Sequence, residues 1–125
     1  MNGEAAKMID KAGRALSAAQ ILLDGGSPDF SAGRAYYAML YSAQALLTER
    51  GLHFRKHGGV HAAFGEHFVK TGILEQKYHR WLLDAYDKRL DGDYGIETGI
   101  LPDDARILID QATDFIKAIR NALET

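Results

Sequence analysis

Residues 32–47, AGRAYYAMLYSAQALL, decide the fold, because they are apolar or aromatic on nearly every side of a helix. A helix of this kind is surrounded by other helices, whereas a surface helix keeps a polar face. Pro28-Asp29 favours a helix start, since the missing N–H of proline costs nothing in the first turn, and Gly51 favours an end. We therefore predict a central helix from Pro28 to about Arg50.

Apolar residues recur at three- and four-residue steps on both sides of this helix, which predicts further helices. One precedes it and three follow, and their expected ranges are Ala5 to Leu23, Val60 to about Lys70, Leu74 to about Leu90, and Pro102 to about Leu123. The stretch up to Gly58-Gly59 is expected to be a loop, because a glycine costs about 1 kcal/mol inside a helix.

No alternating strand pattern occurs, so the expected fold class is all-α. We predict an antiparallel up-and-down helical bundle of four long helices plus one short helix. At 125 residues the chain has the size of one domain with one core, so residues 1–125 are expected to form a single domain.

Composition excludes several kinds of site. The chain has no cysteine, which rules out disulfides, thiolate zinc sites and cysteine nucleophiles. A net charge of −2 argues against broad electrostatic wrapping of nucleic acid.

Residues 1–10 lack the long apolar core of a signal peptide, and no stretch is apolar enough to span a membrane. We expect a cytoplasmic protein with no membrane contact.

Basic residues gather in one stretch, from Arg50 to Gly65, which contains no acidic residue. Its members are Arg50, His53, Arg55, Lys56, His57 and His61. The three histidines fall four residues apart and would share one face of an unbroken helix, as a zinc site requires. The glycine pair and the lack of a carboxylate disfavour that interpretation, so we expect no metal and no cofactor. His57 is expected to cap a helix or form a hydrogen bond.

A polar and aromatic stripe follows the central helix at three- and four-residue steps and comprises Arg34, Tyr37, Tyr41, Gln44 and Thr48. The stripe has two interpretations. It covers a neighbouring helix or a symmetry mate, or it lines a groove in which Arg34 binds a carboxylate or phosphate beside the tyrosines. Arg89, Asp93 and Tyr94 form a second cluster, which is either a simple ion pair at a helix end or a group that binds a phosphodiester.

Three blocks occur in order along the chain, and they are RAYYAMLY at 34–41, KHGGV at 56–60 and RLDGDY at 89–94. Together they resemble the HEPN domain family, and in particular its short stand-alone bacterial and archaeal branch. The resemblance implies a helical bundle, a homodimer, and a partner that is a minimal nucleotidyltransferase protein in a toxin-antitoxin-like pair.

Many HEPN relatives are metal-independent ribonucleases that use an arginine and a histidine with four to six residues between them. Arg50 and His57 have six intervening residues, and Arg55 and His61 have five. On the later helix where the family's pair usually lies, this chain has Arg89 and Tyr94 without a histidine.

Three functions therefore stay open. The leading one is a homodimer in which the stripe and the cluster from Arg89 to Tyr94 line a shared cleft. This cleft is expected to bind a nucleotide, a nucleic acid or a nucleotidyltransferase partner, and the expected binding residues are Arg34, Tyr37, Tyr41, Arg50, Arg55, Lys56 and Asp93. The second is an endoribonuclease toxin in which His57 is the general base and Arg50, Arg55 or Arg89 stabilises the phosphate, with Tyr94 as a further candidate catalytic residue. The third is a protein-interaction module without a small ligand.

Overall fold

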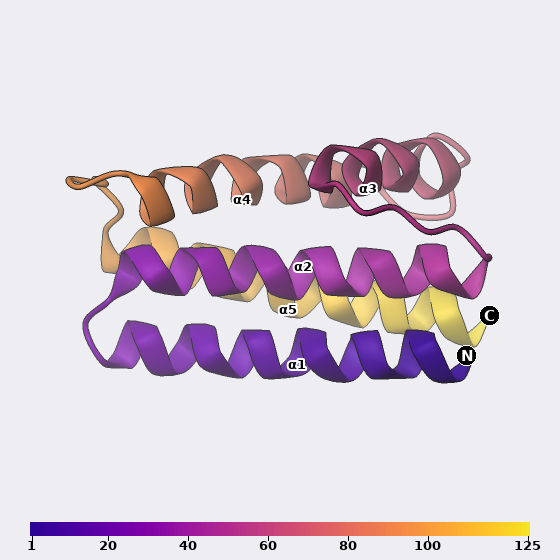
Figure 1. The fold of residues 1–125 in the computed structure, drawn as a ribbon, viewed down its shortest axis with the longest axis horizontal. Coiled ribbons are helices and arrows are strands. Elements are labelled where there is room, and N and C mark those ends of the chain that lie inside the picture. Colours follow the sequence, from indigo (N-terminus) through magenta and orange to yellow (C-terminus); the bar gives the residue numbers. More distant parts are fainter.

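The computed structural model describes residues 1–125 and consists of helices joined by short loops (Figure 1). This confirms the predicted all-helical bundle. The elements are α1 (Gly3–Asp24), α2 (Pro28–Glu49), α3 (His57–Phe64), a π-helical turn η1 (Gly65–Val69), α4 (Gln76–Tyr94) and α5 (Pro102–Glu124). Both termini lie at the same end of the bundle.

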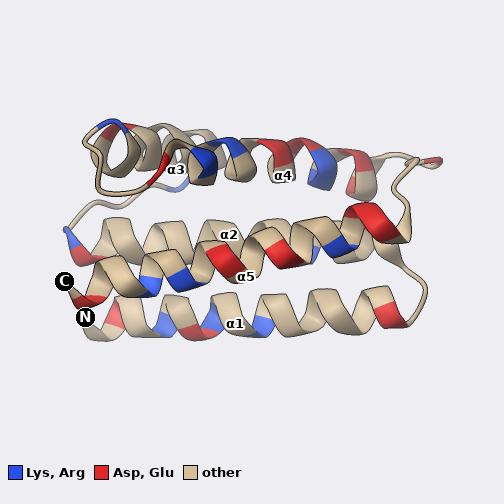
Figure 2. Ribbon diagram, turned by 180° about the vertical axis from the view of Figure 1, so that it is seen from behind, with Lys and Arg blue, Asp and Glu red and all other residues tan.

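α2 occupies the centre, as the sequence predicts, with α1, α4 and α5 packed around it and α3 across one end. Its small residues allow close approach, since Ala32, Ala35, Ala38, Ala43 and Ala45 are all fully buried. Lysine, arginine and the acidic residues lie mostly on α1, α4 and α5, while α2 is nearly uncharged (Figure 2). The buried side chains form one continuous core around this helix.

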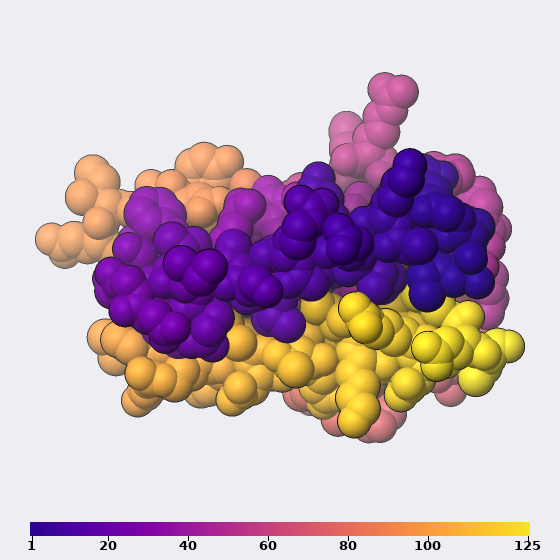
Figure 3. Space-filling view, turned by 90° about the horizontal axis from the view of Figure 1, so that it is seen from below, coloured from indigo at the N-terminus to yellow at the C-terminus, as the bar shows by residue number.

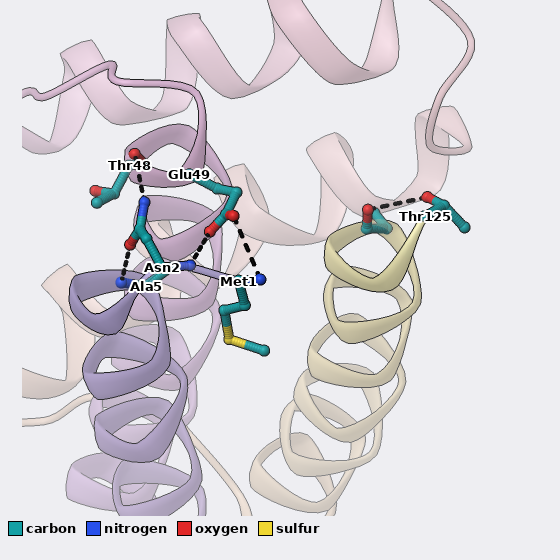
Figure 4. A network of polar contacts seen from close by, with 7 residues as sticks. Met1, Asn2, Ala5, Thr48, Glu49 and Thr125 are labelled. Carbon is teal, nitrogen blue, oxygen red and sulfur yellow. Dashed lines mark hydrogen bonds and ion pairs between the residues drawn. The ribbon is translucent and has the colours of Figure 1, made fainter.

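The start of α1 is fixed to the end of α2 by a small polar network (Figure 4). Asn2 Oδ1 accepts a hydrogen bond from the Ala5 N–H at 2.8 Å, which caps α1. The Glu49 carboxylate accepts from the Asn2 N–H at 2.7 Å and lies 3.5 Å from the N-terminal amino group. These contacts hold the two helices in antiparallel register at that end.

α1 and α5 run side by side along the face opposite α4 (Figure 3). α5 begins at Pro102, and the Asp104 carboxylate accepts a hydrogen bond from the Leu101 N–H at 2.9 Å, as expected for an acidic first turn. None of the helices has both the length and the apolar character needed to cross a membrane.

Two predicted helix boundaries are wrong. α3 begins at His57 and includes Gly58-Gly59, because the glycine pair falls in the first turn, where the Val60 N–H already bonds to the Lys56 carbonyl. The regular helix then ends at Phe64 and continues as η1. α4 begins at Gln76 and continues past Gly92 to Tyr94, whereas the sequence predicted an end near Leu90.

Gly92 explains why α4 continues there. The helix passes so close to the first turn of α2 that a Cβ at position 92 would lie 2.6 Å from the Asp29 carbonyl oxygen. Only glycine leaves room for that backbone contact. The close approach brings the last turn of α4 against α2.

We predict that Gly92→Ala lowers the free energy of unfolding by about 1–3 kcal/mol, because the added methyl group forces the two backbones apart. The matched control is Gly13→Ala in the interior of α1, where an added Cβ meets no atom within 4 Å. That change should raise stability by about 0.5–1 kcal/mol. Urea denaturation followed by circular dichroism measures both, and equal effects of the two substitutions would contradict the close contact.

Candidate functional site

Arg89 on α4 contacts Tyr37 on α2. Its Nη2 atom donates a hydrogen bond to Tyr37 Oη at 2.9 Å, and its side chain is only 15% exposed. Arg89 Nε lies 2.9 Å from Asp93 Oδ2, so the two residues form an ion pair, although this N–H makes no hydrogen bond of good geometry. Gly33 lies opposite the pair, since a Cβ there would be 3.1 Å from Asp93 Oδ1.

Arg34 reaches the same tyrosine from within α2. Its guanidinium lies 4.7 Å from the centre of the Tyr37 ring, while that of Arg89 lies 5.4 Å from it. Arg34 forms no ion pair with any carboxylate. Tyr94, an exposed residue at the end of α4, has its ring 5.5 Å from the Arg89 guanidinium. Of the two guanidinium groups at Tyr37, only that of Arg89 is paired with a carboxylate, so the local charge is positive.

His57 joins this surface from the first turn of α3. Its ring centre lies 5.7 Å from that of Tyr37, edge to face, and its side chain is half-buried. Below it, the fully buried hydroxyl of Tyr36 lies 2.9 Å from His57 Nδ1 and 2.8 Å from His61 Nε2. We call Arg34, Tyr37, His57 and Arg89 the arginine–tyrosine surface, and Tyr36, His57 and His61 the buried triad.

All three members of the buried triad are neutral at pH 7. Burial and then the charge of Arg89 lower the pKa of His57 below its usual 6.5. Burial, followed by the neighbouring His57 and His79, lowers the pKa of His61 to about 4. Burial and the nearby Tyr37 raise the pKa of Tyr36, so its phenol stays protonated. One phenol proton cannot satisfy both imidazoles, so one histidine donates to Tyr36 and the other accepts from it.

The structure brings six of the predicted site residues together, and these are Arg34, Tyr37, His57, Arg89, Asp93 and Tyr94. Tyr41 packs beside them, with its ring centre 5.6 Å from that of Tyr37 and Lys11 4.6 Å above it. The other two residues of the stripe, Gln44 and Thr48, lie apart from this group and line a separate small hollow with Met8.

The remaining basic residues lie apart from this group. The Arg50 guanidinium stacks 4.9 Å from the Phe68 ring near the other end of α2. Arg55 and Lys56 are exposed on the loop before α3 and form no ion pair. His53 lies on the same loop, away from the helix that carries the other two histidines, and no group of three or more side chains is arranged to hold a metal ion.

Tyr36 and His61 were not identified as site residues from the sequence. Tyr36 belongs to the apolar run of the central helix, and its role follows only once α3 is seen to begin at His57. One signal does exist in the sequence. His57 and His61 stand one helical turn apart, and a buried tyrosine needs a hydrogen-bond partner.

We predict that the protein loses stability in mild acid because of His61. In the unfolded chain His61 binds a proton near pH 6.5, whereas in the folded chain it does so only near pH 4. Stability contributed by neutral His61 is therefore present above pH 6.5 and lost as the pH falls toward 4. Since one pH unit is worth about 1.4 kcal/mol, the loss is about 3 kcal/mol.

Urea denaturation at pH 7 and pH 4.5 measures this loss. His61→Gln keeps a hydrogen-bond acceptor without titrating, so this variant should lose clearly less stability between the two pH values than the wild type. His53→Gln, on the exposed loop, is the matched control and should retain the full acid sensitivity. An acid sensitivity unchanged by His61→Gln would contradict the assignment.

Comparison with known proteins agrees with this architecture. The HEPN domain model matches residues 5–122. The UPF0332 protein glr0978 of Gloeobacter violaceus is 38% identical over 118 residues, which cover 94% of each chain. Two proteins of Methanocaldococcus jannaschii carry the names "Putative toxin MJ0605" and "Putative toxin MJ0142". They are 36% and 31% identical over 94% and 96% of this chain, and over 87% and 82% of their own lengths. The chain therefore belongs to the HEPN domain family.

Proposed function

We propose that this chain is the toxin-like member of a two-protein system and that it binds phosphate groups of a nucleotide or RNA at the arginine–tyrosine surface. The observation that carries the proposal is Arg34, a guanidinium stacked on Tyr37 with no carboxylate to neutralise it. The names of the relatives support the toxin-like part of the proposal.

The chemistry of the surface suits a nucleotide. A guanidinium presents a planar set of donors that matches the oxygen atoms of a phosphate. Arg89 is already oriented by Tyr37 and Asp93, so little side-chain entropy remains to be lost when an anion binds. The exposed ring of Tyr94, beside Arg89, offers a face on which a base can stack.

We also propose two contacts with other protein chains, one with a second copy of this chain and one with a partner protein. The arginine–tyrosine surface is open, and the larger hollows of the chain are lined by other residues. A second copy in a homodimer would convert this open surface into a cleft. A minimal nucleotidyltransferase protein in the cytoplasm is the proposed partner, because the three sequence blocks resemble HEPN proteins that work beside such enzymes.

We predict that Arg34→Gln weakens binding of a fluorescein-labelled single-stranded RNA about tenfold or more. A charge-assisted hydrogen bond is worth about 1.5–3 kcal/mol, and 1.4 kcal/mol corresponds to a factor of ten. The slope of log affinity against log salt should also become shallower by about one, as expected when one phosphate contact is lost. Fluorescence polarisation at several salt concentrations measures both quantities.

Arg120→Gln on α5 is the matched control, since it removes the same charge from an exposed position on another helix. This variant should bind RNA like the wild type. Equal weakening by the two substitutions would show that only net charge matters and would contradict a specific surface. Absence of RNA and nucleotide binding by the wild type would favour the protein-interaction module.

A second function, a metal-independent endoribonuclease, is favoured by one observation. His57 and Arg89 both contact Tyr37, and burial and then the charge of Arg89 lower the pKa of His57, so its imidazole is neutral at pH 7. A neutral imidazole can accept the proton of a ribose 2′-hydroxyl, and an adjacent guanidinium can stabilise the charge that develops on the phosphate. The proton taken up by His57 is then returned, directly or through solvent, to the 5′-oxygen that leaves the phosphorus atom.

Under this second function, the protein should cleave mixed RNA in the presence of a chelator, and His57→Ala should slow cleavage by at least about a hundredfold. Gel analysis of a time course provides the measurement. His53→Ala serves as the control for removal of a nearby histidine. RNA that stays intact, or cleavage that is equal in wild type and His57→Ala, would eliminate the ribonuclease.

A further inference from the structure

One hydrogen-bond partner would satisfy the hydroxyl of a buried tyrosine, but in the buried triad the Tyr36 hydroxyl has two. Tyr36 lies entirely in the core, and its single hydroxyl serves two imidazoles, 2.9 Å from His57 Nδ1 and 2.8 Å from His61 Nε2. His61 is 6% exposed, whereas His57 is half-buried and forms no hydrogen bond through Nε2. One end of this chain of hydrogen bonds is therefore enclosed, and the other reaches the arginine–tyrosine surface.

We infer that His57 is a third anion-binding residue of this surface, that it takes up a proton when an anion binds, and that Tyr36 and His61 are the positioning residues that permit this. The inference rests on the proposed phosphate-binding function and names how the site is regulated by protons. It concerns anions of the phosphate and sulfate type, whether they belong to RNA or are free in solution.

The protons can be accounted for atom by atom. A proton from solvent is added to His57, which then carries N–H groups on both ring nitrogens. The Nδ1–H group donates to Tyr36 Oη, and Nε2–H is available to the anion. The Tyr36 hydroxyl must then donate to His61 Nε2, which can accept because burial keeps His61 neutral. In the tautomer in which neutral His57 already donates through Nδ1–H and Tyr36 donates to His61, the added proton enters at His57 Nε2, no internal hydrogen bond changes, and no covalent bond other than N–H is formed.

Charges on the neighbouring helices make this uptake depend on the anion. His57 is faced by Arg89 and Tyr86 from α4, by Tyr36 and Tyr37 from α2, and by His61 from its own helix. Without a ligand, the positive charge of Arg89 opposes a second positive charge on His57. An anion placed between them neutralises Arg89 and attracts a protonated imidazole. Binding and protonation therefore favour each other.

Isothermal titration calorimetry in buffers of different ionisation enthalpy measures the number of protons taken up on binding. Two probes are used at pH 6.5, sodium sulfate and a 2′-O-methyl oligouridylate, whose blocked ribose hydroxyl prevents cleavage. Neither titrates between about pH 5 and 8, so the proton must come to the protein. The wild type should take up a measurable fraction of one proton, and its affinity should rise at least severalfold from pH 8 to pH 6.

The following variants distinguish a positioning role of Tyr36 and His61 from a role in packing alone. Tyr36→Phe removes one oxygen atom and keeps the ring, so it should bind both probes with no proton uptake and a flat pH profile. His57→Asn should behave in the same way. His61→Gln retains an acceptor for Tyr36 and should preserve uptake, whereas His61→Leu should abolish it. The comparison of His61→Gln with His61→Leu tests the positioning role even if Tyr36→Phe does not fold.

Binding of either probe by the wild type without proton uptake would overturn the inference and leave the proposed binding function intact. Equal uptake by His61→Gln and His61→Leu would also overturn it, because the acceptor on His61 would then be irrelevant. Failure of the wild type to bind either probe would instead refute the proposed function. Uptake with the oligouridylate but no binding of sulfate would support the inference and identify RNA as the source of the anion.

Discussion

Burial of α2 on nearly all sides is the constraint on which the rest of the structure depends. A helix so enclosed must satisfy each polar side chain from within the protein. Ser31 Oγ donates to the Ala19 carbonyl at 2.7 Å, and Ser42 Oγ donates to the Met39 carbonyl at 2.9 Å. Tyr36 is satisfied by two histidines of α3. Polar groups that cannot be matched in this way are confined to one strip of the helix, where Arg34 and Tyr37 reach the surface.

This strip gives α2 its organising role. α3 is the next helix after α2 and α4 comes later in the sequence, and both direct polar side chains to the same short segment of α2, residues 34–37. The close approach at Gly92 brings the last turn of α4 into reach of Tyr37, and the hydrogen bonds of Tyr36 fix the first turn of α3. A positive surface and a neutral network beneath it therefore arise from neighbouring residues of one helix.

The fold was largely predictable from the sequence, and the site only in pieces. The all-round apolar character of residues 32–47 predicted the central helix, and the structure confirms it. The glycines led to two wrong helix boundaries, because Gly58-Gly59 lies in the first turn of α3 and Gly92 lies in close contact with α2, so neither ends a helix. The stripe on α2 and the cluster at the end of α4 were expected to line one cleft, whereas the sequence did not show which of their residues meet, or that His57 contacts them. Their proximity depends on helix packing, which periodicity does not encode, and so does the placement of Tyr36 against His61.

The central claim is that anions of nucleic acid type bind over residues 34–37 of α2, between the contributions of α3 and α4. Backbone and side-chain NMR of the isotope-labelled protein during titration with the oligouridylate tests it most directly. The account predicts the largest shift changes at Arg34, Tyr37, His57 and Arg89, with little change along α1 or at the hollow lined by His79 and Leu83. Changes centred on that hollow, or spread evenly over the basic residues, would contradict it.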